Sequence, residues 1–179
     1  LYPDSALGQM VKFVRNRIIL VMSQQKSFIV KREKLEKAIG FLVPAKKFAD
    51  LSIPLFVTST DLQSGELIIH NQGNLIDALV LSCTIPGYVE ATRRGEQVLV
   101  DGGVIDPVPV DILKEQGNYV LAVNITKNSI SEMKKQNIYE IMVRSDMIKS
   151  QYLAKSKIEK ADFVIHPDVG DLHWSRFDE

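Results

Sequence analysis

The sequence predicts an α/β fold in which helices pack on a mainly parallel sheet. Short apolar, β-rich runs alternate with stretches of helical periodicity over residues 53–166, and this alternation is typical of parallel strands joined by helices. The 179 residues, of which 45% are hydrophobic and 25% charged, suffice for one domain with a sizeable core. We expect one domain over residues 1–179, with a helical region over 1–50 and an α/β part over 51–179.

The helical region is predicted to contain two helices. Lys31 to Phe41 forms a charged stretch that ends near Pro44. The lysines around it indicate a solvated face, with contact to lipid phosphates as the alternative. Before it, apolar residues recur at helical spacing and predict a core-facing helix: Leu7, Met10, Val11, Val14, Ile18 and Val21.

Two hairpins and a helix are expected next. Residues 54–60 and 66–70 are β-rich and are separated by a turn at Gln63-Ser64-Gly65. Asp61 begins this turn, where an aspartate more often hydrogen-bonds its own backbone than takes part in catalysis. Asn74 is suited to cap a helix from Leu75 to Leu81. A second hairpin is predicted around Arg93-Arg94-Gly95.

The last third of the sequence predicts two helices and two strands. These are a helix from Val110 to Gln116 closed by Gly117, a strand from Tyr119 to Ile125, a helix from Asn137 to Lys157 and a strand from Ala161 to His166. One face of the long helix is predicted to be a core stripe, formed by Ile138, Ile141, Met142, Ser145, Ile148, Lys149 and Tyr152.

Charge and cysteine content narrow the function classes. Lys plus Arg and Asp plus Glu both number 22, so net charge provides no general attraction to nucleic acid or to an anionic membrane. Cys83 is the single cysteine, which excludes an intrachain disulfide and a cysteine-based zinc site and fits a reducing compartment. We expect its side chain to be buried. No run approaches the roughly 20 apolar residues of a membrane helix.

The run from Val98 to Pro109 is the most informative part of the sequence. An apolar strand delivers Asp101 into a turn of two glycines, which is how a catalytic carboxylate is usually presented. Gly102 and Gly103 have no Cβ to crowd the acid, and they permit a positive φ. We therefore predict that Asp101 is catalytic and that Gly102 and Gly103 support its loop.

Three segments around this run resemble the patatin-like phospholipase family of acyl hydrolases. They are Pro54 to Glu66 with its Thr-Asp-Leu turn, Asn74 to Gly87 ending in Ser-x-x-Ile-Pro-Gly, and the Asp-Gly-Gly element followed by Pro-x-Pro. The resemblance implies a three-layer α/β/α acyl-hydrolase fold. It also implies a Ser-Asp dyad with Asp101 as the general base, no histidine and no cofactor or metal.

The family's serine lies in a Gly-x-Ser-x-Gly elbow, and this sequence lacks one because no two of its glycines are four positions apart. We therefore expect a partial domain that bears the acid, with the serine outside this segment. The predicted function is part of a lipid acyl hydrolase of phospholipase A, lysophospholipase or esterase type, inactive as this segment alone. The alternative is a non-catalytic lipid- or protein-binding module on the same fold.

This hypothesis implies a phospholipid or another acyl ester as the partner. The expected location is cytoplasmic, with peripheral contact at a membrane surface as an option. In such an enzyme, the first amphipathic helix has an alternative role as a cover over the acyl site.

Other polar residues carry weaker hypotheses. Ser82 lacks flanking glycines and a nearby histidine, which favours a structural hydroxyl over a nucleophile. His70 and His166 are expected at partly buried positions, and neither they nor His173 are needed as catalysts.

The acidic residues allow a last alternative, in which Asp61, Asp101, Asp106 and Asp111 bind Mg²⁺ or Ca²⁺. Asp106 stands where family members often carry Asn. It would raise the proton affinity of Asp101 if the two side chains came close.

Overall fold

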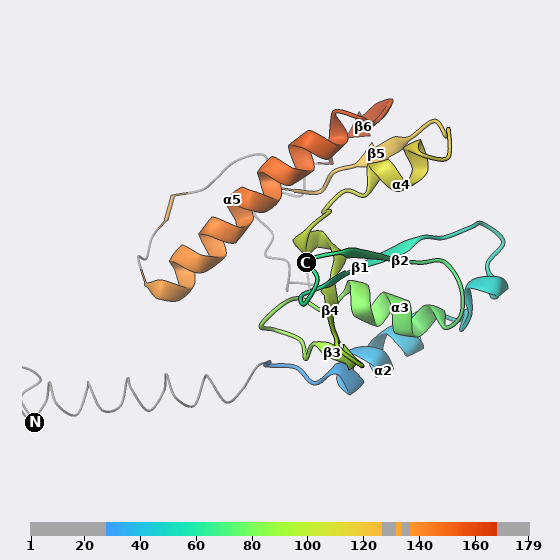
Figure 1. Ribbon diagram of the computed structural model, residues 1–179, viewed down its shortest axis with the longest axis horizontal. Helices are drawn as coiled ribbons and strands as arrows, with labels where there is room; N and C mark the ends of the chain where they lie inside the picture. The colour runs from blue at the N-terminus through green and yellow to red at the C-terminus, as the bar shows by residue number, and fades with distance from the viewer. Residues whose placement is uncertain (1–27, 127–131, 134–136, 168–179) are drawn as a thin grey trace, which may run out of the picture.

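The computed structural model describes residues 28–126, 132–133 and 137–167, and these form the predicted α/β fold (Figure 1). The predicted helix over residues 7–21 lies outside the described residues, as does His173. In chain order the elements are α2 Arg32–Leu42, η1 Phe48–Asp50, β1 Val57–Asp61, β2 Leu67–His70, α3 Leu75–Ser82, β3 Thr92–Arg94, β4 Gln97–Asp101, η2 Gly102–Val104, α4 Val110–Lys114, β5 Leu121–Val123, α5 Ile138–Ile158 and β6 Phe163–Ile165.

The strands form two sheets. Four strands are antiparallel in the order β2-β1-β4-β3, and β5 and β6 form a parallel pair. The prediction of a mainly parallel sheet is therefore wrong for the described residues. The tight turns between β1 and β2 and between β3 and β4 can join only antiparallel neighbours. Only after β4 is a helix placed between two strands that pair in parallel: α5 lies between β5 and β6 in the chain.

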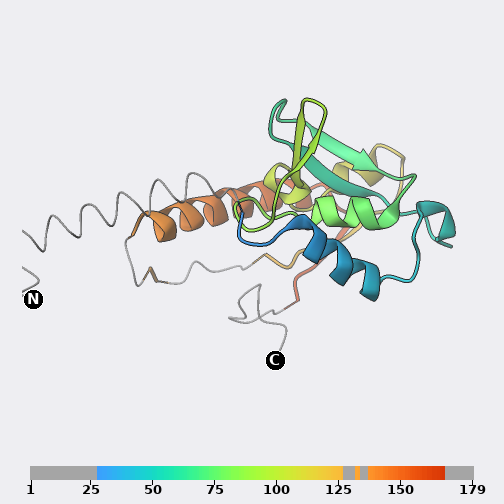
Figure 2. The same ribbon diagram turned by 90° about the horizontal axis from the view of Figure 1, so that it is seen from below.

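The four-stranded sheet is covered by two layers of helix. Figure 2 shows α3 between this sheet and α2, and α3 contacts both β1 and β4. The Asn74 side chain caps α3 as predicted, because its Oδ1 accepts a hydrogen bond of 3.0 Å from the backbone N–H of Asp77. Apolar side chains of α3 and β4 are completely buried between the layers, namely Leu75, Val80, Leu81, Leu99 and Val100.

The long helix α5 buries much less of its surface than predicted. Its one buried side chain among the described residues is Ala154, and it lies in a small core with Val108, Val110, Val120 and Ala122. The predicted core stripe is wrong, since Ile138, Met142 and Tyr152 are 76%, 67% and 75% exposed. With 21 residues, α5 is roughly 31 Å long, whereas the three-residue strands β5 and β6 extend roughly 10 Å each. The helix therefore runs past the surface on which it packs (Figure 1).

None of the helices in the described ranges is long and apolar enough to span a membrane.

Candidate functional site

Asp101 is the last residue of β4, at the point where the strand turns into the short helix η2. Its backbone N–H donates to the Thr84 carbonyl at 2.9 Å, which ties the strand end to the loop after α3. Its Oδ1 accepts a hydrogen bond of 2.8 Å from the Gly103 N–H. The backbone of Asp101 and one oxygen of its carboxylate are thus each fixed by a hydrogen bond.

The two glycines act through close approach and not through a positive φ. The described glycines with positive φ are Gly65, Gly73, Gly87, Gly95 and Gly117, so the predicted conformational role of Gly102 and Gly103 is wrong. A Cβ on Gly102 would lie 2.2 Å from Thr58 Oγ1 and 2.9 Å from the Thr58 carbonyl carbon, because η2 packs directly on β1. A Cβ on Gly103 would lie 3.3 Å from Asp101 Oδ1.

Asp101 is half-buried, and its surroundings favour the protonated form. Burial raises the pKa of the Asp101 carboxyl, and the hydrogen bond from the Gly103 N–H opposes that rise in part. A higher pKa makes the carboxylate a stronger base at neutral pH. The sequence suggested that a nearby Asp106 would raise the proton affinity of Asp101. It does not do so, because the Asp106 carboxylate binds Lys157 Nζ at 2.9 Å.

Cys83 lies beside this carboxylate. Cys83 is an exposed residue, so the prediction of a buried cysteine is wrong: the residue follows the last turn of α3, outside the buried face of that helix. Burial of the sulfur's immediate surroundings and the negative charge of Asp101 both raise the pKa of the Cys83 thiol. The negative charge of Asp101 thus opposes ionisation of the thiol.

We expect Asp101→Asn to accelerate alkylation of Cys83. Removing the negative charge lowers the pKa of the Cys83 thiol, so more thiolate is present at pH 8 and iodoacetamide reacts faster. The measurement is the rate of modification of the Cys83 peptide by mass spectrometry, with Asp146→Asn as a control on the exposed side of α5. An unchanged rate in Asp101→Asn would show that the two groups do not interact.

Asp61 has the turn role that the sequence predicted. Its Oδ1 accepts hydrogen bonds of 3.0 Å from the backbone N–H groups of Gln63 and Val98, and its Oδ2 accepts one of 3.2 Å from the Ser64 hydroxyl. The N–H groups of Gln63 and Val98 lower the pKa of the Asp61 carboxyl. An ionised, fully engaged carboxylate of this kind holds the β1–β2 turn and the start of β4 together.

The metal hypothesis finds no matching geometry. In the ranges that the structure covers, no three His, Cys, Asp or Glu side chains are placed to hold an ion. The Asp61 carboxylate accepts hydrogen bonds within its turn, and that of Asp101 accepts one from the Gly103 N–H. Asp106 and Asp111 both bind Lys157 Nζ, at 2.9 and 2.6 Å. The positive charges beside these two acids are the ammonium groups of Lys157 and Lys160.

Within the described part of the chain, Ser82 and His166 belong to no catalytic arrangement. Ser82 is the last residue of α3, and its hydroxyl has no histidine or aspartate partner among the described hydrogen bonds. His166 is exposed, contrary to prediction, whereas His70 is partly buried as predicted.

The sequence reasoning missed a hydrogen bond of 2.8 Å between Ser59 Oγ and His70 Nε2. Strand alternation carried the signal, since Val57 pairs with His70 and Ser59 lies on the same face of β1. Burial, together with the positive charge of Arg94, lowers the pKa of His70 and keeps the ring neutral. Ser59 is fully buried, so its hydroxyl is not accessible from solvent.

Comparisons with known proteins agree on one family. The model of the patatin-like phospholipase family matches residues 4–114. An uncharacterized NTE family protein of Mycobacterium bovis is 38% identical over 58 residues, which are 32% of this chain and 10% of that protein. One of Mycobacterium tuberculosis is 32% identical over 82 residues, 46% of this chain and 23% of the relative.

Patatin-like phospholipase domain-containing protein 6 of Mus musculus is 25% identical over 131 residues, which are 71% of this chain and 9% of that protein. The chain thus spans less than a quarter of each of these three relatives.

Proposed function

Since the chain belongs to the patatin-like phospholipase family, a family of lipid hydrolases, we propose that it is the acid-bearing part of a lipid acyl hydrolase. The activity is of phospholipase A, lysophospholipase or esterase type. Asp101 is the general base, and the nucleophilic serine and the oxyanion donors come from outside residues 1–179. The observation that carries this proposal is the half-buried Asp101 carboxylate, fixed by the Gly103 N–H at 2.8 Å and made more basic by burial.

Ester cleavage then proceeds in two steps around this carboxylate. The serine hydroxyl transfers its proton to Asp101 while its oxygen attacks the ester carbonyl, and the protonated Asp101 returns that proton to the leaving alcohol as the ester bond breaks. Water next gives a proton to Asp101 and attacks the acyl-serine. The fatty acid leaves, and the serine recovers its hydrogen from Asp101. No histidine is needed, because one carboxylate moves every proton.

The substrate class we propose is a phospholipid or another acyl ester, reached by peripheral contact with a membrane surface from the cytoplasm. The exposed lysines on and around α2 support contact with lipid phosphates. Four of these lysines are exposed and form no ion pair within the described part of the chain, namely Lys31, Lys34, Lys37 and Lys47.

The proposed activity is tested with a water-soluble ester. We expect a protein that joins this chain to a Gly-x-Ser-x-Gly segment to hydrolyse a p-nitrophenyl acyl ester at full rate in EDTA, because proton transfer and not a metal ion generates the nucleophile. The 179-residue chain by itself is expected to be inactive. Activity that vanishes with EDTA and returns with Mg²⁺ or Ca²⁺ would contradict the Ser-Asp dyad. A soluble ester is used because its hydrolysis does not depend on any calcium that binding to a lipid surface requires.

A further inference from the structure

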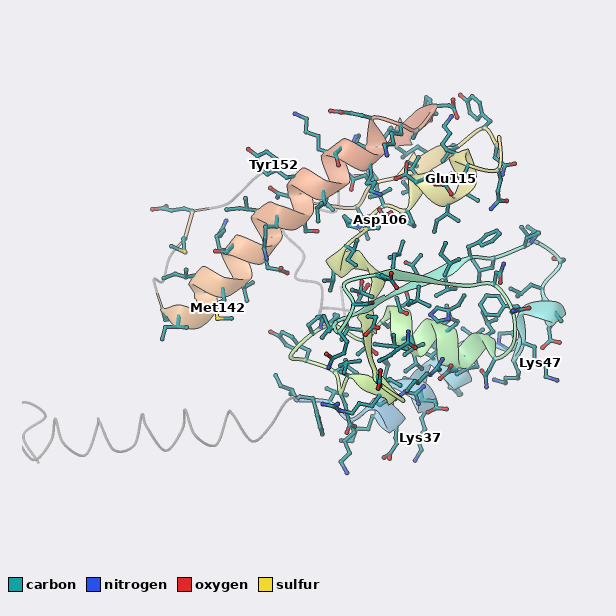
Figure 3. All side chains as sticks on the ribbon, viewed as in Figure 1. Lys37, Lys47, Asp106, Glu115, Met142 and Tyr152 are labelled. Atoms are coloured by element: carbon teal, nitrogen blue, oxygen red, sulfur yellow. The ribbon has the colours of Figure 1, made fainter. Side chains whose placement is uncertain are left out.

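A lysine on α5 reaches into the loop that follows Asp101. Lys157 Nζ lies 2.9 Å from Asp106 Oδ2 and 2.6 Å from Asp111 Oδ2, while Lys160 binds the other oxygen of Asp111 at 2.7 Å. The Asp106 side chain is 2% exposed and that of Lys157 22%. Figure 3 shows Asp106 on the segment between η2 and α4, facing the C-terminal part of α5. Elements 51 residues apart in sequence are thus joined at a buried carboxylate.

Asp106 also closes the turn that Asp101 opens. The backbone N–H groups of Asp106 and Ile105 both donate to the Gly102 carbonyl, at 2.9 and 3.1 Å. The hydroxyl of Thr60, on β1, donates to the same carbonyl at 3.4 Å. A shift of Asp106 therefore moves Gly102 and, through it, the end of β4 where the Asp101 carboxylate is held.

We propose that Lys157 is a positioning residue for Asp101, acting through its ion pair with Asp106. The inference rests on the proposed function, because it assigns Lys157 to the same general base. Lys157 holds Asp106 in the protein interior, Asp106 holds the Gly102 carbonyl, and the Gly103 N–H then stays within reach of the Asp101 carboxylate. Lys157 touches no reacting atom in this scheme.

The second oxygen of Asp106 explains why the loop depends on Lys157. Asp106 Oδ1 is buried and has no hydrogen-bond partner among the described residues. Without Lys157 the carboxylate would be a buried charge with no compensation, a state that a protein relieves by protonating the group or by moving it toward water. Asparagine at this position carries no charge, so it has no such tendency.

The test uses Lys157→Met, Asp106→Asn with Lys157→Met, and Lys160→Met in the protein that also carries the nucleophile. Lys160 is a matched control, since it binds Asp111 but not Asp106. We expect Lys157→Met to lower kcat toward a soluble ester about 10- to 100-fold with KM within twofold, as loss of alignment does. The double variant should recover kcat to within about fivefold of wild type, and Lys160→Met should stay at the wild-type rate.

A second readout separates misplacement of Asp101 from general loss of stability. In Lys157→Met, the alkylation rate of Cys83 is expected to rise as kcat falls, because a displaced Asp101 carboxylate no longer raises the pKa of the thiol. If Lys157→Met does not fold, the kcat and the melting temperature of the Asp106→Asn, Lys157→Met double variant test the role of Lys157 instead. A folded double variant with kcat reduced 100-fold overturns the inference.

The failure of this inference and of the proposed function are distinguishable. Wild-type kcat in folded Lys157→Met, beside an inactive Asp101→Asn, overturns only the role of Lys157. Wild-type activity in Asp101→Asn overturns both.

Discussion

Asp101→Asn is expected to reduce ester hydrolysis about 10²–10⁴-fold in the protein that carries the nucleophile. Asparagine keeps the shape of the side chain, and its amide oxygen still accepts the hydrogen bond from the Gly103 N–H. It cannot take the serine proton at neutral pH. The loss should therefore fall on kcat, with the melting temperature and KM close to those of the wild type. Steady-state kinetics with a soluble ester and a thermal melt measure both quantities.

The pH dependence of the wild type gives the same assignment an independent check. A general base works in its deprotonated form, so activity falls as pH decreases through the pKa of Asp101. Because burial raises that pKa, the acid limb should lie above the ordinary range of an aspartate. The control is Asp146→Asn, which removes an aspartate whose side chain is 80% exposed on α5. Activity within a few-fold of wild type in Asp101→Asn would remove Asp101 from its role.

Gly102→Ala is expected to be the most damaging small substitution in the loop. The new Cβ would lie 2.2 Å from Thr58 Oγ1, 2.8 Å from Thr58 Cβ and 2.9 Å from the Thr58 carbonyl carbon. Rotation of the Thr58 side chain relieves only the first of these contacts, so β1 and η2 must separate. Overpacking of this kind costs about 1–3 kcal/mol, or a fall in melting temperature of roughly 2–12 °C for a chain of this size.

The activity of Gly102→Ala should fall further than its stability suggests, because the displaced segment carries Asp101. Gly40→Ala is the matched control. Gly40 lies within α2, with nothing within 4 Å of an added Cβ, and alanine there should stabilise the helix by up to about 1 kcal/mol. Differential scanning fluorimetry and ester turnover measure the pair. An unchanged melting temperature and full activity in Gly102→Ala would mean that η2 does not pack on β1 as described.

The features that local sequence determines were predicted well. Asn74 before an apolar helical run, Asp61 before Ser-Gly, and an apolar strand that ends in Asp-Gly-Gly each depend on neighbours within a few residues. Their hydrogen bonds follow from backbone geometry at that point. The position of Asp101 at a strand end is of this kind.

Long-range features were not predictable in the same way. The ion pair of Lys157 with Asp106 joins residues 51 positions apart, and no local sequence pattern predicts it. The exposure of Met142 and Tyr152 on α5 depends on how far the helix extends past β5 and β6, while periodicity alone reports that a helix is amphipathic. Gly102 was singled out for a positive φ and for the room it leaves beside Asp101, whereas the close neighbour is Thr58, which only the fold reveals.

The central claim is that Asp101 activates a serine that lies outside residues 1–179. Its most direct test is to treat the protein that carries the nucleophile with a fluorophosphonate, which reacts with activated serines, and to map the modified residue by mass spectrometry. We expect a single labelled serine outside residues 1–179 in the wild type, and no labelling above a denatured control in Asp101→Asn. Labelling of Ser59 or Ser82, or undiminished labelling in Asp101→Asn, would contradict it.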